Sequence, residues 1–411
     1  MPLDIANYTG REQAYVKHHF LAEYLEKLIF KISSAYQELV YIDGFSGPWQ
    51  NRGEAFQDTS FGIALRALTT AKQTWATMTN PSQRRSVKMT AHLVEKNPAA
   101  FARLAELQRM FPEIEVVPHK GDFTVIAPAI ANHLSSRAFS FVLVDPKGWS
   151  VDLAAIQPLI ERESCEIVFN FMFDFINRFA LSDDPATAAQ LDRLIPGRDW
   201  RARIRAIDEQ TRADSERLHP SDARKVVLVE EFKAALAEIG QYRFVADIDI
   251  LRPTLDRTLY FLVYATRQPP GLEVFRDCHV ASLQKQSELR GKRKLAGRQE
   301  RSGQFELLAS TNEMGPDRSA VSLALEEIQA RRMLLDLAPL AGRGSRWDAL
   351  WPAVLSECVI RLSDLKRIAN EYRKSGALVF PGWPTASKRV PEDNYIVFRG
   401  DNPAQFEGSL I

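Results

Sequence analysis

The sequence predicts an α/β protein, with an open, mostly parallel sheet covered by helices and a smaller domain at the carboxyl end. Three observations predict this class. Four apolar segments of strand length alternate with segments of helical periodicity between residues 39 and 162. Each of these four segments ends in an acidic residue. Two more strand-like segments within 243–266, joined by a short turn, are typical of an antiparallel pair at the edge of such a sheet.

Composition limits the classes of protein to which the chain can belong. Its 411 residues suffice for more than one domain, and 45% hydrophobic and 26% charged residues are usual for a soluble protein. The formal net charge is +1, so any nucleic-acid contact depends on a local basic patch. Cys165, Cys278 and Cys358 are too scattered for a disulfide framework or a zinc site. With no signal peptide and no membrane span, we expect a cytoplasmic protein without a metal.

The first helix is predicted over residues 12–32, where apolar side chains recur at helical intervals. Lys17, His18 and His19 lie near its start. These polar side chains either face solvent on a packing helix or contact a cofactor or substrate.

The first strand, residues 39–43, ends in Asp43 and runs directly into Gly44, Phe45, Ser46 and Gly47. It reads as a buried parallel strand with a glycine turn at its carboxyl end, which is where open α/β sheets bind ligands. Gly44 and Gly47 lack the Cβ that would keep the backbone away from a cofactor. Two glycines at this spacing also occur in ordinary turns, so the interpretation depends on the strands that follow.

The second strand, residues 89–95, ends in Glu95. A carboxylate here can accept hydrogen bonds from both hydroxyls of a ribose, because both of its oxygens are acceptors. It can equally cap the helix that begins at Pro98. The interval from Asp43 favours the ribose role.

The third strand ends at Gly121, Asp122 and Phe123. The acid can accept the amino group of an adenine, and the aromatic ring can cover a face of the base. The fourth and most apolar strand, residues 138–145, stops at the dipeptide Asp145-Pro146. Four acidic strand ends in this order, with a two-glycine turn only at the first, are typical of a fold that binds S-adenosylmethionine.

A dinucleotide is the competing cofactor. Its pyrophosphate requires a G-x-G-x-x-G turn that opens a helix, so that backbone donors and the helix dipole face the phosphates. The turn here begins with Asp43, which would repel phosphate. S-adenosylmethionine carries an amine and a sulfonium that attract a carboxylate, so the sequence favours methyl transfer over hydride transfer.

Five segments carry a resemblance to a known family: KHHFLAEYLEKL, YIDGFSGPW, LVEKN, GDF and LVDPKGW. From about Lys17 into its carboxyl-terminal region, the chain resembles the bacterial three-Cys-motif partner proteins, which are named for a neighbouring gene product. It is similar, more distantly, to ribosomal-RNA adenine methyltransferases that pair an amino-terminal Lys-His with a strand-end Asp-Pro-Pro-aromatic motif.

The resemblance implies a Rossmann-like class I methyltransferase fold with an antiparallel closing strand, and the three-Cys-motif protein of the same operon as a partner. Lys17 and His18 match the amino-terminal Lys-His pair of the motif. The resemblance implies that Lys17 contacts the cofactor and His18 the substrate. The implied S-adenosylmethionine pocket lies over Asp43, Gly44, Phe45, Gly47, Glu95, Asp122 and Phe123.

The loop after the fourth strand departs from the motif. Exocyclic-amine methyltransferases use Asp or Asn, Pro, Pro and an aromatic residue, in which the acid and a proline carbonyl accept amine hydrogens and the aromatic stacks on the base. This chain keeps Asp145 and Pro146, has Lys147 for the second proline, and places Trp149 one position later, beyond Gly148. We expect Asp145, Pro146 and Trp149 to be catalytic and Lys147 to meet a phosphate. Alternatively, the loop serves another acceptor or none, and Trp149 is a core residue.

Three domains are predicted from the remaining sequence. Residues 1–275 form the methyltransferase-like domain, with a helical insertion at about 180–222; residues 276–320 form a basic helix and linker; residues 321–411 form the last domain. The basic segment, residues 284–301, holds seven lysines and arginines against two glutamates, and is either a solvated helix face or a strip that binds phosphates.

The last domain has the order of a winged helix: a helix, a second helix capped by Ser363 and ended by Gly376, and a hairpin. Lys366 and Arg367 on the second helix, with Lys388 and Arg389 in the hairpin, are predicted to contact nucleic acid. Winged domains also bind proteins.

Together these features predict an S-adenosylmethionine-dependent methyltransferase that acts on DNA or RNA at an exocyclic base amine. The first alternative is a non-catalytic, nucleoside-sensing module that binds DNA together with an operon partner. The second is a small-molecule methyltransferase with a protein-binding tail.

Overall fold

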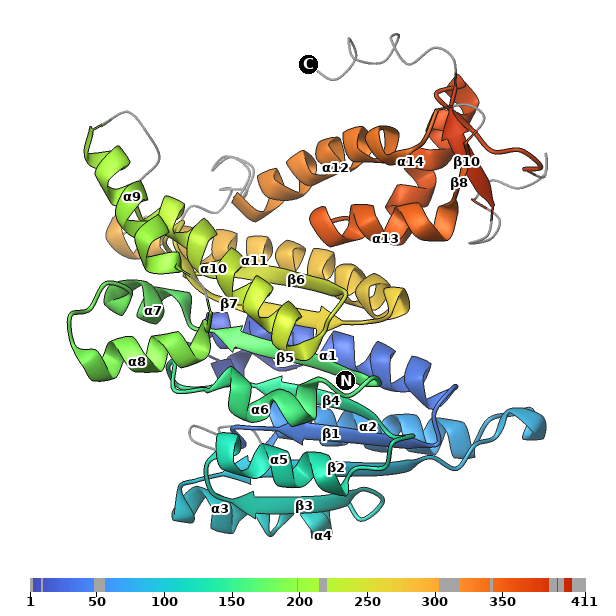
Figure 1. Cartoon of the computed structure of the whole chain (residues 1–411). Coiled ribbons are helices and arrows are strands. Elements are labelled where there is room, and N and C mark those ends of the chain that lie inside the picture. The colour runs from blue at the N-terminus through green and yellow to red at the C-terminus, as the bar shows by residue number, and fades with distance from the viewer. Residues whose placement is uncertain are drawn as a thin grey trace. The chain divides into compact units, whose positions relative to one another are not determined.

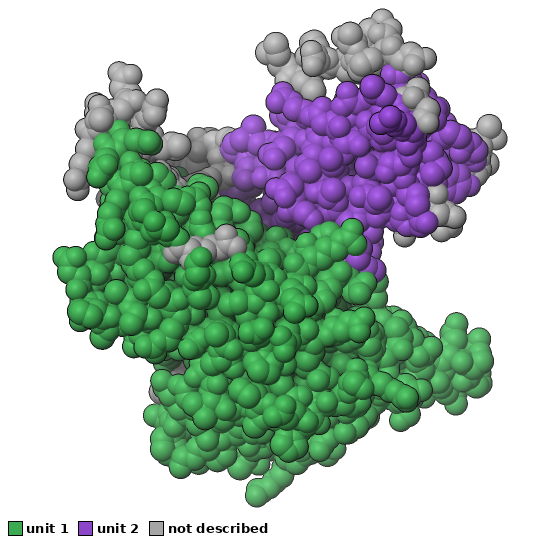
Figure 2. All heavy atoms as spheres, in the orientation of Figure 1, with its two compact units in different colours: residues 1–268 green, residues 269–411 purple. Residues whose placement is uncertain are grey.

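The chain folds as two compact units, Met1–Gln268 and Pro269–Ile411, coloured green and purple in Figure 2. The structure is a computed structural model that describes residues 3–8, 10–47, 56–197, 199–213, 220–302, 318–340, 343–383, 390 and 395–400. The division lies between Gln268 and Pro269, and Pro269 begins a helix that continues to Ser302. Residues 269–275, which the sequence assigns to the first domain, therefore lie in the second unit.

The first unit is built on a seven-stranded sheet with the order β3-β2-β1-β4-β5-β7-β6. Strand β7 is antiparallel to both of its neighbours, and the other strand pairs are parallel. This is the Rossmann-like class I arrangement with an antiparallel closing strand that the sequence predicts (Figure 1). The strands are β1 (Glu38–Asp43), β2 (Lys88–Glu95), β3 (Glu115–Lys120), β4 (Phe139–Val144), β5 (Cys165–Phe171), β6 (Phe244–Leu251) and β7 (Thr258–Thr266).

Helices cover both faces of this sheet, which explains why its central strands are mostly apolar and fully buried. Every residue of β4 and β5 is buried, as expected of parallel strands without a solvent face. Helices α1 (Glu12–Ser33) and α2 (Ser60–Ala76) pack against each other, and α5 (Phe123–His133), α6 (Leu153–Ile160) and α10 (Pro220–Gly240) share one core with alternate residues of β1, β4, β5 and β7.

Shorter helices complete the first unit. Helices α3 (Pro98–Leu104) and α4 (Leu107–Met110) join β2 to β3, and α7 (Phe173–Phe179), α8 (Pro185–Leu194) and α9 (Trp200–Ala213) follow β5. The 3-10 turns η1 (Ile5–Tyr8) and η3 (Pro81–Gln83) precede α1 and β2. Trp200, at the start of α9, is fully buried in the core of α6 and α10 and anchors the predicted helical insertion.

The second unit contains α11 (Pro269–Ser302), α12 (Arg318–Leu337), β8 (Ser345–Arg346), α13 (Trp347–Glu357), α14 (Leu362–Ser375), β9 (Leu378–Val379) and β10 (Ile396–Arg399). Strands β8, β10 and β9 form an antiparallel sheet in that order. The prediction that Ser363 caps α14 is wrong, because the helix begins at Leu362 and Ser363 is already its second residue. The N-cap is Arg361, which makes no side-chain cap bond. Gly376 ends α14 in the left-handed region (φ +80°), as predicted.

The described residues contain neither a helix suited to span a membrane nor a cluster suited to hold a metal ion. No helix there combines the length and the apolar character needed to cross a membrane. The same residues contain no group of three or more His, Cys, Asp or Glu side chains arranged to hold a metal ion. Cys165, Cys278 and Cys358 are buried free thiols.

Candidate functional site

A cavity of about 570 Å³ lies at the carboxyl ends of the parallel strands of the first unit. This edge is where open α/β sheets bind ligands, because the strand order reverses there between β1 and β4. Eleven of the predicted site residues line this one cavity: Lys17, His18, Gly44, Phe45, Gly47, Glu95, Asp122, Phe123, Asp145, Pro146 and Lys147. Residues separated by up to 130 positions in the sequence are thus brought together.

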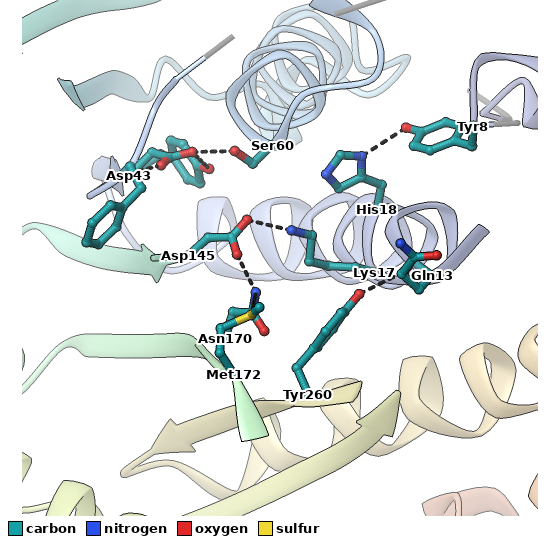
Figure 3. A network of polar contacts seen from close by, with 12 residues as sticks. Tyr8, Gln13, Lys17, His18, Asp43, Ser60, Asp145, Asn170, Met172 and Tyr260 are labelled. Atoms are coloured by element: carbon teal, nitrogen blue, oxygen red, sulfur yellow. Dashed lines mark hydrogen bonds and ion pairs between the residues drawn. The ribbon is translucent and has the colours of Figure 1, made fainter. Parts of the chain in front are cut away.

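Asp43 is the first of two predicted residues of this unit that do not line the cavity. Its carboxylate is fully buried and accepts hydrogen bonds from the Tyr41 hydroxyl (3.1 Å), the Phe45 backbone N–H (3.0 Å) and the Ser60 hydroxyl (2.6 Å) (Figure 3). Burial raises the pKa of Asp43, and the hydrogen bonds from Ser60 and Phe45 oppose this rise. Asp43 therefore fixes the turn that follows β1, and its own side chain does not line the cavity.

Gly44 is required by its packing against Phe123. A Cβ at Gly44 would lie 2.8 Å from two ring atoms of Phe123, which is buried. The ring of Phe45 meets that of Phe123 edge to face, with centroids 6.0 Å apart. The sequence links the missing Cβ of Gly44 to the approach of a cofactor. In the structure, the space that this Cβ would occupy is needed for the ring of Phe123.

Glu95 and Asp122 differ in how their carboxylates are held. Glu95 is buried and accepts the backbone N–H of Asn97 at 2.6 Å, whereas the side chain of Asn97 caps α3. The alternative that Glu95 caps this helix is therefore excluded. Asp122 does cap a helix: its Oδ1 accepts the backbone N–H (3.0 Å) and the hydroxyl (2.7 Å) of Thr124 at the start of α5.

Lys17 and Asp145 form an ion pair inside the cavity (Figure 3). Lys17 Nζ lies 2.5 Å from Asp145 Oδ2, and about a fifth of each side chain is exposed (18% and 20%). Burial by itself raises the pKa of Asp145, but the Lys17 charge and the hydrogen bonds from Lys17 and Asn170 outweigh it and hold the pKa below its usual value. Asp145 is consequently a carboxylate at neutral pH.

Asn170, near the end of β5, is a cavity residue, and as a polar residue near the end of an apolar strand it is expected either near the substrate side or as an ordinary strand terminus. Its Nδ2 donates to Asp145 Oδ1 at 2.5 Å and lies 3.5 Å from the sulfur of Met172. Its Oδ1 is buried and finds no hydrogen-bond partner among the described residues. Because Asp145 is ionised it can only accept, so the amide must present Nδ2 to it and turn Oδ1 away. The one polar residue near the end of the apolar segment CEIVFNF was the available clue.

His18 lines the cavity as a neutral imidazole. Its Nδ1 lies 2.9 Å from the Tyr8 hydroxyl, and burial together with the Lys17 charge lowers its pKa from 6.5 to about 3. Nearby, the Tyr260 hydroxyl donates to the Gln13 carbonyl at 2.7 Å and ties β7 to α1 (Figure 3). These contacts hold the Lys-His segment of α1 at the cavity.

Arg11 and Asp58 are cavity residues that sequence reasoning missed. Arg11 pairs with the buried Asp58 at 3.1 Å, and both residues line the cavity. Neither lies at a strand end, so no pattern in the sequence linked them to the site.

Trp149 is the second predicted residue that does not line the cavity. Its ring packs against Phe175 (centroids 4.6 Å apart) and Phe179 (5.0 Å), and its Nε1 donates to Gln190 at 2.9 Å. Trp149 is thus a partly buried residue that packs against the core of the first unit.

Two predicted substrate residues lie on α14 in the second unit. Arg367 pairs with Glu327 of α12 (3.1 Å) and Glu371 (2.9 Å), and Arg331 joins both acids, so Arg367 is engaged within the unit. Lys366 is partly exposed. Lys388 and Arg389 lie outside the described residues.

The basic segment of α11 is less uniform than its sequence indicates. Lys285 (2.9 Å) and Lys292 (2.6 Å) both pair with Glu288, and Arg290 is buried. Where its side chains are described, the segment is therefore not a continuous exposed cationic strip.

Comparison with known proteins gives distant likenesses only. No family model and no curated protein matches the chain. Among solved structures it is similar to precorrin-6y C5,15-methyltransferase from Geobacter metallireducens (13% identity, 59% of this chain and 87% of that chain, TM-score 0.26). It is also similar to TYW2 from M. jannaschii in complex with AdoMet (12%, 59% and 74%, 0.26) and to loganic acid methyltransferase with SAH (8%, 68% and 84%, 0.27). At such identities and TM-scores these likenesses carry no argument about function, and the fold assignment rests on the strand order.

Proposed function

We propose that the protein is an S-adenosylmethionine-dependent methyltransferase that acts on an exocyclic amine of a nucleic-acid base. One observation carries this proposal: a single cavity contains both the residues suited to the cofactor and an ionised, amine-accepting group, Asp145. The cavity volume of about 570 Å³ lies in the usual range of ligand pockets. The strand order supports the proposal, because it puts the cavity where this fold class binds its ligands.

The cofactor would lie over the ends of β1, β2 and β3. The buried carboxylate of Glu95 suits the ribose hydroxyls, and Asp122 suits the adenine amino group beside the ring of Phe123. Asp43 would act indirectly, because its hydrogen bonds from Phe45 and Ser60 hold the backbone that borders the cavity. When bound, S-adenosylmethionine supplies a methyl group on a positively charged sulfur.

The acceptor amine would lie between β4 and β5. Asp145 and the Pro146 carbonyl would accept its hydrogens, as in the motif that this segment resembles. Asn170 Oδ1 adds a buried acceptor, and an unsatisfied buried acceptor costs about 1–3 kcal/mol until a donor reaches it. These acceptors would orient the nitrogen lone pair toward the methyl group, so catalysis would come mainly from positioning.

Lys17 has a distinct part in this scheme. Its ammonium keeps Asp145 ionised without a ligand, so the carboxylate is ready to accept an amine hydrogen. The amine must then share Asp145 with Lys17 or displace it from the carboxylate.

Methyl transfer from tritiated S-adenosylmethionine to total RNA and to DNA tests the proposal directly. We expect incorporation by the wild type, and a loss of about 100-fold or more in kcat for Asp145→Asn with little change in cofactor affinity measured by calorimetry. Asp152→Asn is the matched control, because Asp152 only caps α6 and Asn caps equally well. Cofactor binding without incorporation into either polymer would sink the proposal.

A non-catalytic, nucleoside-sensing module is the second candidate. It is favoured by the location of Trp149, whose ring packs on α7 and leaves no aromatic residue of the DPKGW segment in the cavity. Cofactor binding without methyl transfer to RNA, DNA or a small-molecule extract is the outcome that would favour it.

We further propose that the second unit is a winged-helix domain that helps to bind nucleic acid. The element order α12, β8, α13, α14, β9, β10 and the sheet order β8-β10-β9 support this. Helix α14 would then enter a groove of the nucleic acid. Lys366 and Lys374, both on this helix, would face the phosphate backbone of the nucleic acid. The three-Cys-motif protein of the same operon is proposed as a partner on the resemblance alone, and co-purification of the two proteins after co-expression tests it.

A further inference from the structure

Three arginines surround one buried carboxylate next to the cavity. Asp174, in the first turn of α7, lies 3.2 Å from Arg178 on the same helix and 2.6 Å from Arg252, which follows β6. The third, Arg257, precedes β7 and lies 2.8 Å from the other oxygen of Asp174. We call these three residues the arginine cluster.

The arginine cluster holds more positive charge than Asp174 neutralises. Asp174 is 4% exposed, whereas the side chains of Arg178, Arg252 and Arg257 are 57%, 35% and 50% exposed. Asp256, next to Arg257 in the chain, is a second acid in the hairpin, and the group retains a positive charge even when it is counted. A structural link between the hairpin and α7 needs only one or two of these pairs. The exposed parts of the Arg178 and Arg257 side chains therefore face solvent.

The position of the arginine cluster relates it to the acceptor side of the cavity. Met172, two residues before Asp174, and Leu259, two residues after Arg257, both line the cavity. Both belong to the β5 and β7 side, next to Asn170 and Asp145, whereas the proposed cofactor residues belong to β1, β2 and β3. A base that reached Asp145 would leave its sugar and phosphates at the mouth of the cavity on this side.

We propose that the arginine cluster binds a backbone phosphate of a single-stranded nucleic acid whose base is presented to Asp145. This inference rests on the proposed function, and it assigns the substrate class. A guanidinium has five N–H donors in a planar fork that matches a phosphate. Arg178, which donates to Asp174, and Arg257, which forms an ion pair with it, therefore each keep donors for a phosphate. A single strand suits the site because its base can enter the cavity without first being flipped out of a duplex.

The test measures the salt dependence of oligonucleotide binding. Fluorescence anisotropy would follow a mixed-sequence single-stranded RNA and the DNA of the same sequence across a range of salt concentrations. We expect Arg257→Ala and Arg178→Ala to weaken binding several-fold and to lower the slope of log K against log salt by about 0.7 each, the value for one phosphate contact on a single strand. Arg257→Lys keeps the charge but loses the planar fork of N–H donors. Its affinity for the oligonucleotide should therefore lie between those of the wild type and Arg257→Ala.

Arg109→Ala is the matched control, because Arg109 is an exposed arginine on α4, which precedes β3 and so lies at the amino end of that strand. Its affinity and salt slope should equal those of the wild type. Thermal unfolding of each variant shows whether it is folded, and Arg178→Ala, which leaves Arg252 and Arg257 on Asp174, tests the site if Arg257→Ala unfolds.

The proposal is overturned if the wild type binds neither oligonucleotide, or if folded cluster variants keep the wild-type slope. Its failure can be told apart from that of the proposed function. If the salt slope depends on the arginines but no methyl transfer occurs, the phosphate site is supported and the proposed enzyme activity is rejected. Methyl transfer with an unchanged slope does the reverse.

Discussion

The ammonium of Lys17 and the carboxylate of Asp145 lie 2.5 Å apart, although 128 residues separate them in the chain. One comes from the first helix and the other follows the fourth strand of the sheet. The pair keeps a largely buried carboxylate ionised at the place where an acceptor amine would bind. Its removal has consequences that can be measured in the free protein.

Replacing Lys17 by Met should destabilise the protein by about 1–3 kcal/mol. Breaking a fully buried pair costs about 3–5 kcal/mol, and the partial exposure of this pair lowers the figure. Asp145→Asn in the Lys17→Met background should recover part of the loss, because no unpaired charge then remains. Urea unfolding of the two single variants and the double variant measures this coupling. Strictly additive losses would show that the two groups do not interact.

Gly44→Ala should cost about 2 kcal/mol and weaken cofactor binding, because its Cβ would lie 2.8 Å from the buried Phe123 ring. Gly148→Ala is the control: a Cβ there would meet Phe175 at 3.6 Å, an ordinary contact, and should change stability by less than about 0.5 kcal/mol. Thermal unfolding and calorimetry give the two readouts. Equal stability of both variants would contradict the packing of Phe123 against the turn.

His18 should make stability fall as the pH decreases below about 6.5. Its folded pKa of about 3 is depressed, so between those values the unfolded chain takes up a proton that the folded protein does not. The loss approaches about 1.4 kcal/mol for each pH unit and is absent above about pH 6.5. Urea unfolding of the wild type and His18→Gln at several pH values isolates this effect from that of other groups. Parallel curves for the two proteins would mean that His18 titrates normally.

Trp149→Ala should lower stability by about 2–4 kcal/mol, because it removes the contacts with Phe175 and Phe179. Trp149→Phe should retain most of that stability and leave the kcat of methyl transfer unchanged, since the ring does not line the cavity. Gln190→Ala, which removes only the hydrogen bond to Trp149, should behave like Trp149→Phe. A large fall in kcat for a stable Trp149→Phe protein would mean instead that the ring contacts the substrate.

Much of the first unit could be predicted because its strands and helices follow from local patterns of apolar and polar residues. A strand buried on both faces is mostly apolar, as in β4 and β5, and a polar residue that follows its carboxyl end lies at the ligand edge. This reasoning gave the sheet and the cavity residues that follow its strands, whereas Lys17 and His18, which lie on α1, came from the family resemblance. The strand pattern placed Asn170 near the substrate side but gave it no role, because a polar residue at a strand end can also be an ordinary terminus.

The remaining features depend on contacts between distant segments. Arg257 is an unremarkable hairpin residue until the fold brings it to Asp174, and Arg11 gains its role only beside Asp58. On α14, Arg367 looks available for a phosphate, yet Glu327 of α12 pairs with it. Charged side chains follow no period that reveals their partners, so such pairs could not be read from the sequence.

By itself, therefore, the sequence determined the fold class of the first unit and the edge of the sheet at which a ligand would bind, because hydrophobic periodicity and strand-end residues are local properties. The tertiary structure alone decided how each polar group is used. It made Asp43 a support for the turn, joined Lys17 to Asp145, packed Trp149 on α7 and assembled the arginine cluster. The physical reason is that hydrogen bonds and ion pairs depend on distances of a few ångströms, which are fixed only when the helices and strands pack.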